Sequence, residues 1–372
     1  MTDGPRGGRE MSSAKSETTK RKAAKIPTET KGTVLVTGAS GFIAKHCIVK
    51  LLNEGYKVRG SLRTPGRAEA VRSAIATRAQ TEHLEFVTLD LMQDAGWETA
   101  CSGCDYVQHV ASPFPGATPK DENELIVPAR DGALRAMKAA AKAGVRRVVL
   151  TSSMAAIAYG HDHGPDYVID EKDWSNLKAP LGAYLKSKTI AERAAWEFVE
   201  SEAGQGLELS VINPGAVLGP LLDNRYSTSG EMVARFLRGQ IPAIPRIGFC
   251  CIDVRDVAEA HFRAMILPEA AGRRYLCIED FAWLSDVAKI LHEAGYRVTT
   301  RNLPDWMART LALFDKTLAT YKRALGRKEN CSNARLRNEL GIEPRGLKEM
   351  VLSMAETMVE YGVVTPKMRQ AG

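Results

Sequence analysis

The feature that most constrains this chain is an abrupt change of pattern within residues 33–44. A short apolar, β-branched run, Thr-Val-Leu-Val, ends in the small residues Thr-Gly-Ala-Ser-Gly. A helical pattern starts at once, with apolar positions at Phe42, Ile43, Cys47, Ile48, Leu51 and Leu52. Glycines at 38 and 41 permit a sharp turn and a close approach to a ligand, and Ala44 lets the helix pack near the strand. The stretch therefore predicts strand, tight turn and helix, with a helix N-terminus suited to a pyrophosphate.

The Gly-x-x-Gly-x-x-Ala spacing is by itself also compatible with a purely structural turn, so the wider pattern matters. Strand patterns occur at residues 33–36, 55–63, 84–89, 105–110, 147–151, 207–212 and 275–278. Helical patterns lie between several of them, including 121–143 and 183–203. Pro128 is expected to bend or interrupt the first of these two helices. This alternation predicts an α/β fold with a doubly wound parallel sheet.

The net charge of +7 is distributed unevenly. Residues 1–31 hold eight Lys or Arg, four Asp or Glu and no aromatic residue, so a disordered basic tail is expected over residues 1–30. The rest is only mildly basic, and no nucleic-acid partner is expected. No run approaches the ~18 apolar residues of a membrane span, and the N-terminus lacks the apolar core of a secretory signal. We therefore expect a cytoplasmic protein without a membrane partner, in which the seven irregularly spaced cysteines are reduced.

Two further groups of residues carry chemistry. Tyr184 and Lys188 are four apart on a predicted helix, so they share a face. A neighbouring ammonium favours the phenolate, and such a tyrosine can exchange a proton with a substrate oxygen. Ser152 and Ser153 follow the strand at 147–151, at the edge of a parallel sheet where ligands bind. Taken singly, the pair could be a solvated helix face and the serines a helix cap. Their occurrence in this order after the glycine turn favours an active site.

Together these residues resemble the extended short-chain dehydrogenase/reductase family, and within it the dihydroflavonol reductase-like NADPH-dependent aldehyde and ketone reductases. The resemblance covers roughly residues 33–365. It rests on these motifs: residues 37–44, Asp90-Leu91, His109-Val110-Ala111-Ser112-Pro113-Phe114, Thr151-Ser152-Ser153, Tyr184 to Lys188, Asn213-Pro214-Gly215 and Asp253-Val254-Arg255-Asp256-Val257.

The resemblance implies a role for each matched position. Tyr184 is the expected proton donor, and Lys188 is expected to orient the nicotinamide ribose and to lower the pKa of Tyr184. Ser153 is expected to hold the carbonyl, with Ser152 as the alternative. The expected cofactor contacts, besides Tyr184 and Lys188, are Gly38, Ser40, Gly41, Phe42 and Ile43 in the turn, Asp90 and Leu91 at the adenine, Val110, Ala111 and Ser112 along the cofactor, and Pro214 and Val217 at the nicotinamide.

The choice of cofactor depends on the residues after the second predicted strand. An NAD site usually places Asp or Glu there to bind the ribose hydroxyls. Residues 55–68 contain no acid, and Arg63 follows the strand directly. An arginine in this position can bind a 2′-phosphate through its forked N–H donors, whereas Arg59 is expected to be a solvated surface residue. The sequence therefore predicts NADP(H), and no metal.

The chain is accordingly expected to contain three parts. These are the tail at 1–30, a Rossmann-like NADP-binding domain at 31–220 with strands returning at about 251–280, and a mainly helical substrate-capping region at 221–372. The expected activity is NADPH-dependent reduction of a small-molecule aldehyde or ketone. The alternatives are an NAD-retaining nucleotide-sugar epimerase or dehydratase of the same superfamily and a non-catalytic NADP-sensing protein. Neither the physiological carbonyl nor the choice between monomer and homodimer follows from the sequence.

Overall fold

The structure is a computed structural model of the chain that describes residue 1 and residues 30–113, 119–164, 166–313 and 324–369. The tail expected over residues 1–30 thus lies outside the described residues except at its two ends.

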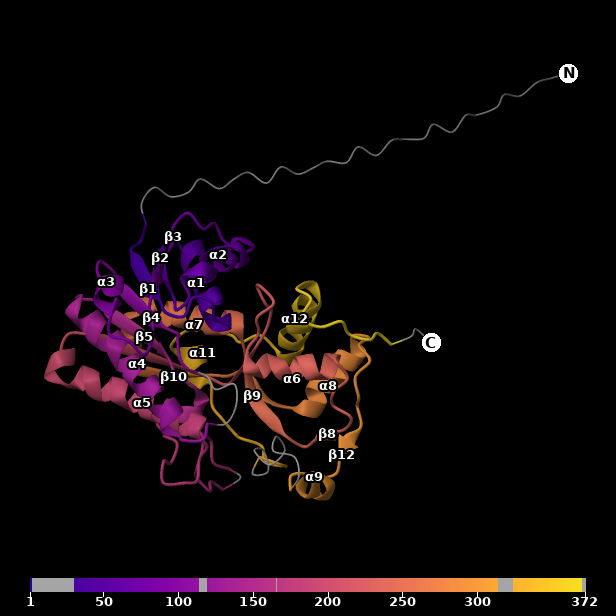
Figure 1. Cartoon of the computed structure of the whole chain (residues 1–372). Helices are drawn as coiled ribbons and strands as arrows, with labels where there is room; N and C mark the ends of the chain where they lie inside the picture. The colour runs from indigo at the N-terminus through magenta and orange to yellow at the C-terminus, as the bar shows by residue number, and fades with distance from the viewer. Residues whose placement is uncertain (2–29, 114–118, 165, 314–323, 370–372) are drawn as a thin grey trace.

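A seven-stranded, all-parallel sheet forms the centre of the molecule (Figure 1). Its strand order is β10-β6-β5-β4-β1-β2-β3, and its strands are β1 (Thr33–Val36), β2 (Lys57–Leu62), β3 (Leu84–Thr88), β4 (Tyr106–His109), β5 (Arg147–Thr151), β6 (Glu208–Pro214) and β10 (Arg273–Cys277). From β1, the strands β2 and β3 follow one another on one side, and β4, β5, β6 and β10 follow one another on the other side. This reversal opens a crevice beyond the carboxyl ends of β1 and β4, where doubly wound sheets bind their ligands. The predicted fold class is confirmed.

Helices cover both faces of the sheet (Figure 1). One face carries α1 (Phe42–Asn53), α2 (Ala68–Ala76) and α7 (Val254–Ile266); the other carries α3 (Trp97–Cys101), α4 (Asn123–Lys142) and α5 (Ala183–Glu200). Alternate residues of β1 serve the two cores, since Val34 and Val36 pack on the α1 side and Leu35 on the α4 side. Pro128 does not interrupt the helix predicted at 121–143: α4 runs through it. The proline is the sixth residue of α4, so the helix loses one i to i−4 hydrogen bond there without ending.

The chain after β6 combines helices with short strands. The helices are α6 (Thr228–Leu237), α8 (Leu284–Glu293), α9 (Asp305–Leu311), α11 (Ala334–Asn338) and α12 (Leu347–Glu360). The strands are β7 (Ala216–Leu218), β8 (Ile244–Pro245), β9 (Gly248–Asp253), β11 (Asp280–Trp283) and β12 (Asn302–Leu303), which form the sheets β11-β9-β7 and β12-β8. Apart from the return to the main sheet, the sequence patterns predicted only helices here. Strands of two to six residues among prolines and glycines are too short to show an alternating pattern.

The capping region shares its core with the main domain. Val233 on α6 and Met354 on α12 belong to the same buried cluster as Ile48 on α1 and Val257 on α7. Within the part of the chain that the structure describes, no helix combines the length and apolar character needed to span a membrane.

Candidate active site

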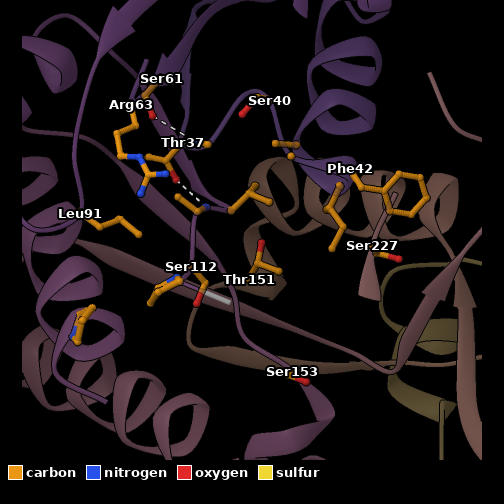
Figure 2. A pocket seen from close by; sticks show the side chains of 18 of the residues that line it. Thr37, Ser40, Phe42, Ser61, Arg63, Leu91, Ser112, Thr151, Ser153 and Ser227 are labelled. Atoms are coloured by element: carbon orange, nitrogen blue, oxygen red, sulfur yellow. Dashed lines mark hydrogen bonds between the residues drawn. The ribbon is translucent and has the colours of Figure 1, made fainter. Parts of the chain in front are cut away.

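A cavity of about 720 Å³ lies beyond the carboxyl ends of the main strands (Figure 2). Residues that directly follow β1, β2, β4, β5 and β6 contribute to its wall. Every position predicted for the site lines it: Gly38, Ser40, Gly41, Phe42, Ile43, Arg63, Asp90, Leu91, Val110, Ala111, Ser112, Ser153, Tyr184, Lys188, Pro214 and Val217. Arg63 lies towards one end of the cavity and Ser153 towards the other (Figure 2). The residues come together because parallel strands present their carboxyl ends at one edge.

The glycine turn forms the part of the wall next to α1. Gly38 has a φ of +70°, and a Cβ at this position would stand 3.0 Å from the Ala111 Cβ, so only glycine fits without strain. Gly41 is the N-cap of α1, and neither a side-chain cap nor an acidic residue occupies the first turn. The N-terminal amide groups of α1 therefore remain available to an anion.

Two hydroxyl groups that sequence reasoning missed hold this turn in place. The Ser61 Oγ on β2 accepts a hydrogen bond from the Gly38 amide at 3.0 Å. The Thr37 Oγ1 accepts one from the Ala111 amide at 3.0 Å and lies 3.0 Å from the His109 Nδ1. Figure 2 shows the bonds to Gly38 and Ala111 as dashed lines. No motif singles out a serine inside a strand, so only the register between β1 and β2 reveals Ser61.

Two arginines near β2 have different surroundings. Arg63 is exposed at the cavity edge, and among the described residues it makes no hydrogen bond or ion pair. Arg59 is not the solvated surface residue that the sequence suggested. Its side chain is only 17% exposed, it pairs with Glu85 at 2.7 Å, and it donates to the Ala100 carbonyl at 2.8 Å. The guanidinium group of Arg59 is thus used in contacts within the fold, whereas that of Arg63 is available to a ligand. Arg67 also lines the cavity.

The opposite end of the cavity contains the predicted catalytic groups. Ser153 caps a short 3-10 helix, Met154–Ala156, and its Oγ accepts a hydrogen bond from the Ala155 amide at 3.1 Å. The same hydroxyl hydrogen-bonds with the side chain of Tyr184. Ser152 lines the cavity too, but its buried hydroxyl has no hydrogen-bond partner among the described residues. The geometry thus pairs Tyr184 with Ser153 rather than with Ser152.

Burial controls the ionisation of these groups. It raises the pKa of Tyr184, and the hydrogen bond with Ser153 opposes this shift in part. The expected lowering of this pKa by Lys188 is wrong for the protein without cofactor, because desolvation of the phenolate is the main cause of the shift and Lys188 is not among its causes. Burial also lowers the pKa of Lys188 to about 8, although the Glu192 carboxylate acts in the opposite direction. At neutral pH the site accordingly holds a protonated phenol beside an ammonium group.

The N-terminus of α6 closes the cavity on the capping side. Tyr226, Ser227, Thr228 and Ser229 line it there, and none of them was predicted. The Ser227 Oγ accepts a hydrogen bond from the Gly230 amide at 3.1 Å and donates one to the Val217 carbonyl at 3.2 Å. The Ser-Thr-Ser-Gly run is a recognisable helix start. Nothing in that pattern, however, indicates that this helix faces the cofactor-binding edge of the sheet.

Comparison with known proteins gives a consistent result. The sequence matches the NAD dependent epimerase/dehydratase family over residues 34–277. Cinnamoyl-CoA reductase 1 of Oryza sativa subsp. japonica is 34% identical over 335 residues, covering 87% of this chain and 90% of that protein. Anthocyanidin reductase ((2S)-flavan-3-ol-forming) of Vitis vinifera is 32% identical over 292 residues, covering 73% and 83%. The crystal structure of yeast methylglyoxal/isovaleraldehyde reductase Gre2 with NADPH has a TM-score of 0.75 at 29% identity, covering 89% of this chain and 100% of that chain.

Proposed function

Because the chain belongs to the NAD dependent epimerase/dehydratase family, within the extended short-chain dehydrogenases/reductases, we propose that it is an NADPH-dependent reductase of aldehydes or ketones. The observation that carries the proposal is the hydrogen-bonded pair of Ser153 and Tyr184, with Lys188 one helical turn further on. These three groups supply a carbonyl-binding hydroxyl, a proton donor and a cation. All three line the same cavity as Arg63, and Figure 2 shows Ser153 and Arg63 towards its opposite ends.

The residues of the cavity fit NADP(H). A Cβ at Gly38 would fill space at the glycine turn, so the glycine leaves room for the cofactor to approach the backbone. The uncapped start of α1 suits the pyrophosphate. Arg63, which has no partner among the described residues, is the group proposed for the 2′-phosphate, with Arg67 beside it. Gre2 was crystallised with NADPH, which supports the same assignment here. When bound, NADPH supplies the hydride for reduction of the carbonyl carbon.

The protein groups then act on the carbonyl oxygen. The Ser153 hydroxyl holds this oxygen by a hydrogen bond, and the Tyr184 hydroxyl donates its proton to it. A raised pKa serves this direction of the reaction, because the phenol carries its proton at neutral pH. The Lys188 ammonium stabilises the phenolate that forms after the transfer and provides donors for the ribose hydroxyls.

The relatives support reduction in general more than any one substrate. Their names cover a cinnamoyl-CoA reductase, an anthocyanidin reductase and a methylglyoxal/isovaleraldehyde reductase. We therefore propose an aldehyde or ketone as the substrate class and do not specify the group attached to the carbonyl carbon.

The test is a screen of NADPH oxidation by the purified full-length chain. The substrates are aliphatic aldehydes, aryl aldehydes, 2-oxoaldehydes, diketones and dihydroflavonols, each compared with a reaction without substrate. We expect at least one class to consume NADPH and to yield the alcohol in equal amount. NADPH binding without consumption by any class would favour the sensing protein. A tightly retained NAD, with no net consumption of NADPH, would favour the epimerase or dehydratase.

A further inference from the structure

A buried carboxylate lies one helical turn beyond Lys188. Glu192 on α5 is 0% exposed, and it does not line the main cavity. Its Oε1 accepts a hydrogen bond from the Arg274 Nε at 2.5 Å, and its Oε2 accepts one from the Asn213 Nδ2 at 2.7 Å. A carboxylate with this burial stays charged only where donors and cations surround it.

The network around this carboxylate reaches two parts of the fold. The Asn213 Nδ2 also donates to the Ser153 carbonyl at 3.2 Å, so Glu192 is linked to the backbone of the serine that pairs with Tyr184. On the other side, the Arg274 Nη1 donates to the carbonyls of Glu171 and Asp173 at 3.0 and 2.8 Å. Glu192 thus connects the catalytic end of the cavity with the segment at 171–173, which Arg274 on β10 binds through its carbonyl groups.

A small cavity lies beside Glu192 and the lysine. Its volume is about 20 Å³, which is enough for one water molecule. Lys188 and Glu192 both line it, together with the buried Ser152, whose hydroxyl has no partner among the described residues. A single water at this position can bridge the hydroxyl, the ammonium and the carboxylate.

The other groups that face Lys188 carry no compensating negative charge. On α5, Tyr184 is a protonated phenol at neutral pH. On β4, burial and the charge of Lys188 lower the pKa of His109 to about 3, so this imidazole is neutral. The elements packed against this side present Ala129 and Ala133 from α4, and Leu150, Thr151 and Ser152 from β5 and its end. Among the described residues lining the small cavity, Glu192 is the one carboxylate.

We propose that Glu192 is a positioning residue of the reductase: its carboxylate keeps Lys188 in the ammonium form across the small cavity and, through Asn213, fixes the backbone of Ser153. This inference rests on the proposed function. It differs from a purely structural role, in which the network only attaches the segment at 171–174 to β10 and α5.

The experiment measures the charge of Lys188 directly. The full-length protein without cofactor is acetylated with a trace of acetic anhydride between pH 6 and 11, and the labelling of Lys188 is quantified by peptide mass spectrometry. Glu192→Gln keeps the shape of the side chain and removes its charge. We expect its labelling midpoint to lie about one pH unit below that of the wild type. The alkaline limb of kcat/KM for the best carbonyl substrate should shift in the same direction.

Glu171→Gln is the matched control. Glu171 is also a buried glutamate of this network, and it accepts a hydrogen bond from the Leu276 amide at 2.9 Å, on the far side of Arg274 from Lys188. This variant should lower thermal stability and leave the Lys188 midpoint unchanged. An equal midpoint in wild type and Glu192→Gln, or equal shifts in both variants, would overturn the proposal.

If Glu192→Gln fails to fold, Glu192→Asp provides the second variant, because it retains the charge but moves it by one methylene. A smaller shift in the same direction supports the proposal, and an unchanged midpoint contradicts it. The labelling requires no turnover. A wild type that reduces no carbonyl therefore refutes the proposed function, whereas an active wild type with an unchanged Glu192→Gln midpoint refutes only this inference.

Discussion

The two walls of the cavity are built in different ways. The wall from the main sheet consists of strand ends and a helix N-terminus whose positions are set by the parallel register of β1, β2 and β4. The capping wall is the start of α6, which is attached by the apolar packing of residues such as Val233 and by the hydrogen bond from the Ser227 Oγ to the Val217 carbonyl. Backbone pairing between strands, supplemented by the hydroxyl groups of Thr37 and Ser61, fixes the first wall, whereas side-chain contacts fix the second. We therefore expect changes in the first to affect chemistry and cofactor binding, and changes in the second to affect stability.

Two tyrosines on opposite walls give the sharpest contrast. Tyr184→Phe removes the proposed proton donor and should reduce kcat by roughly 10²–10⁴-fold while NADPH affinity stays nearly constant. Tyr226 also lines the cavity, but its hydroxyl donates to the Glu231 Oε2 at 2.8 Å on α6, the helix that follows it. Tyr226→Phe should change kcat by only a few-fold. Steady-state rates and NADPH titrations of both variants test this contrast, and similar losses in the two would contradict it.

Arg63 tests the sheet wall at the cofactor end. A charge-assisted hydrogen bond contributes about 1.5–3 kcal/mol, and about 1.4 kcal/mol corresponds to tenfold in affinity. NADPH should therefore be preferred over NADH by at least about tenfold, and Arg63→Ala should remove most of this preference without affecting NADH.

Arg78→Ala is the control, because Arg78 is an exposed arginine outside the cavity. The measurement is kcat/KM for both cofactors at saturating substrate. Equal losses with NADPH and NADH in Arg63→Ala would show that Arg63 does not bind the 2′-phosphate.

The pH dependence of cofactor binding should follow Lys188. Its pKa lies at about 8, so the ammonium form dominates below this pH and is lost as the pH rises through it. NADPH affinity should therefore fall several-fold between pH 7 and 9, because a neutral amine is a weaker donor to the ribose hydroxyls. Fluorescence titration at each pH measures the NADPH affinity. The same profile in Tyr184→Phe excludes ionisation of the phenol as the cause, and a flat profile in the wild type would contradict the assignment.

The smallest expected effect is on the capping wall. Ser227→Ala removes the N-cap of α6, which usually costs about 1 kcal/mol, and should lower Tm by about 1–2 °C in a chain of this length. The NADPH/NADH preference should not change. Thr228→Ala, one position further into the helix, is the control and should be nearly neutral. A loss of cofactor preference in Ser227→Ala would mean that the two walls of the cavity are coupled.

The sequence predicted the sheet wall far better than the capping wall. Gly38, Arg63, Ser153, Tyr184 and Lys188 stand at strand ends or on a long helix, where local pattern and sheet topology together determine their place. Side chains whose contacts depend on residues distant in the sequence show no recognisable sequence pattern. Ser61 reaches the glycine turn only through the pairing of β1 with β2.

The short strands after β6 and the ionisation states could not be read from the sequence for two physical reasons. Strands such as β8 and β12 have two residues each, so they show no periodicity, and their pairing is set by tertiary contacts. The pKa of Tyr184 depends on how far the fold removes the phenol from water, which spacing alone does not show. The i, i+4 relation to Lys188 indicated a neighbouring charge but not the larger effect of burial.

Hydride transfer itself is measured by following deuterium from NADPH labelled at C4 of the nicotinamide to the best carbonyl substrate. For NADPH labelled on the transferred face, we expect alcohol with one deuterium on the former carbonyl carbon, formed in equal amount to the NADP⁺ and lost almost completely in Tyr184→Phe. NADPH that binds without transferring deuterium from either face to any substrate of the screen, or an undiminished rate in Tyr184→Phe, would contradict it.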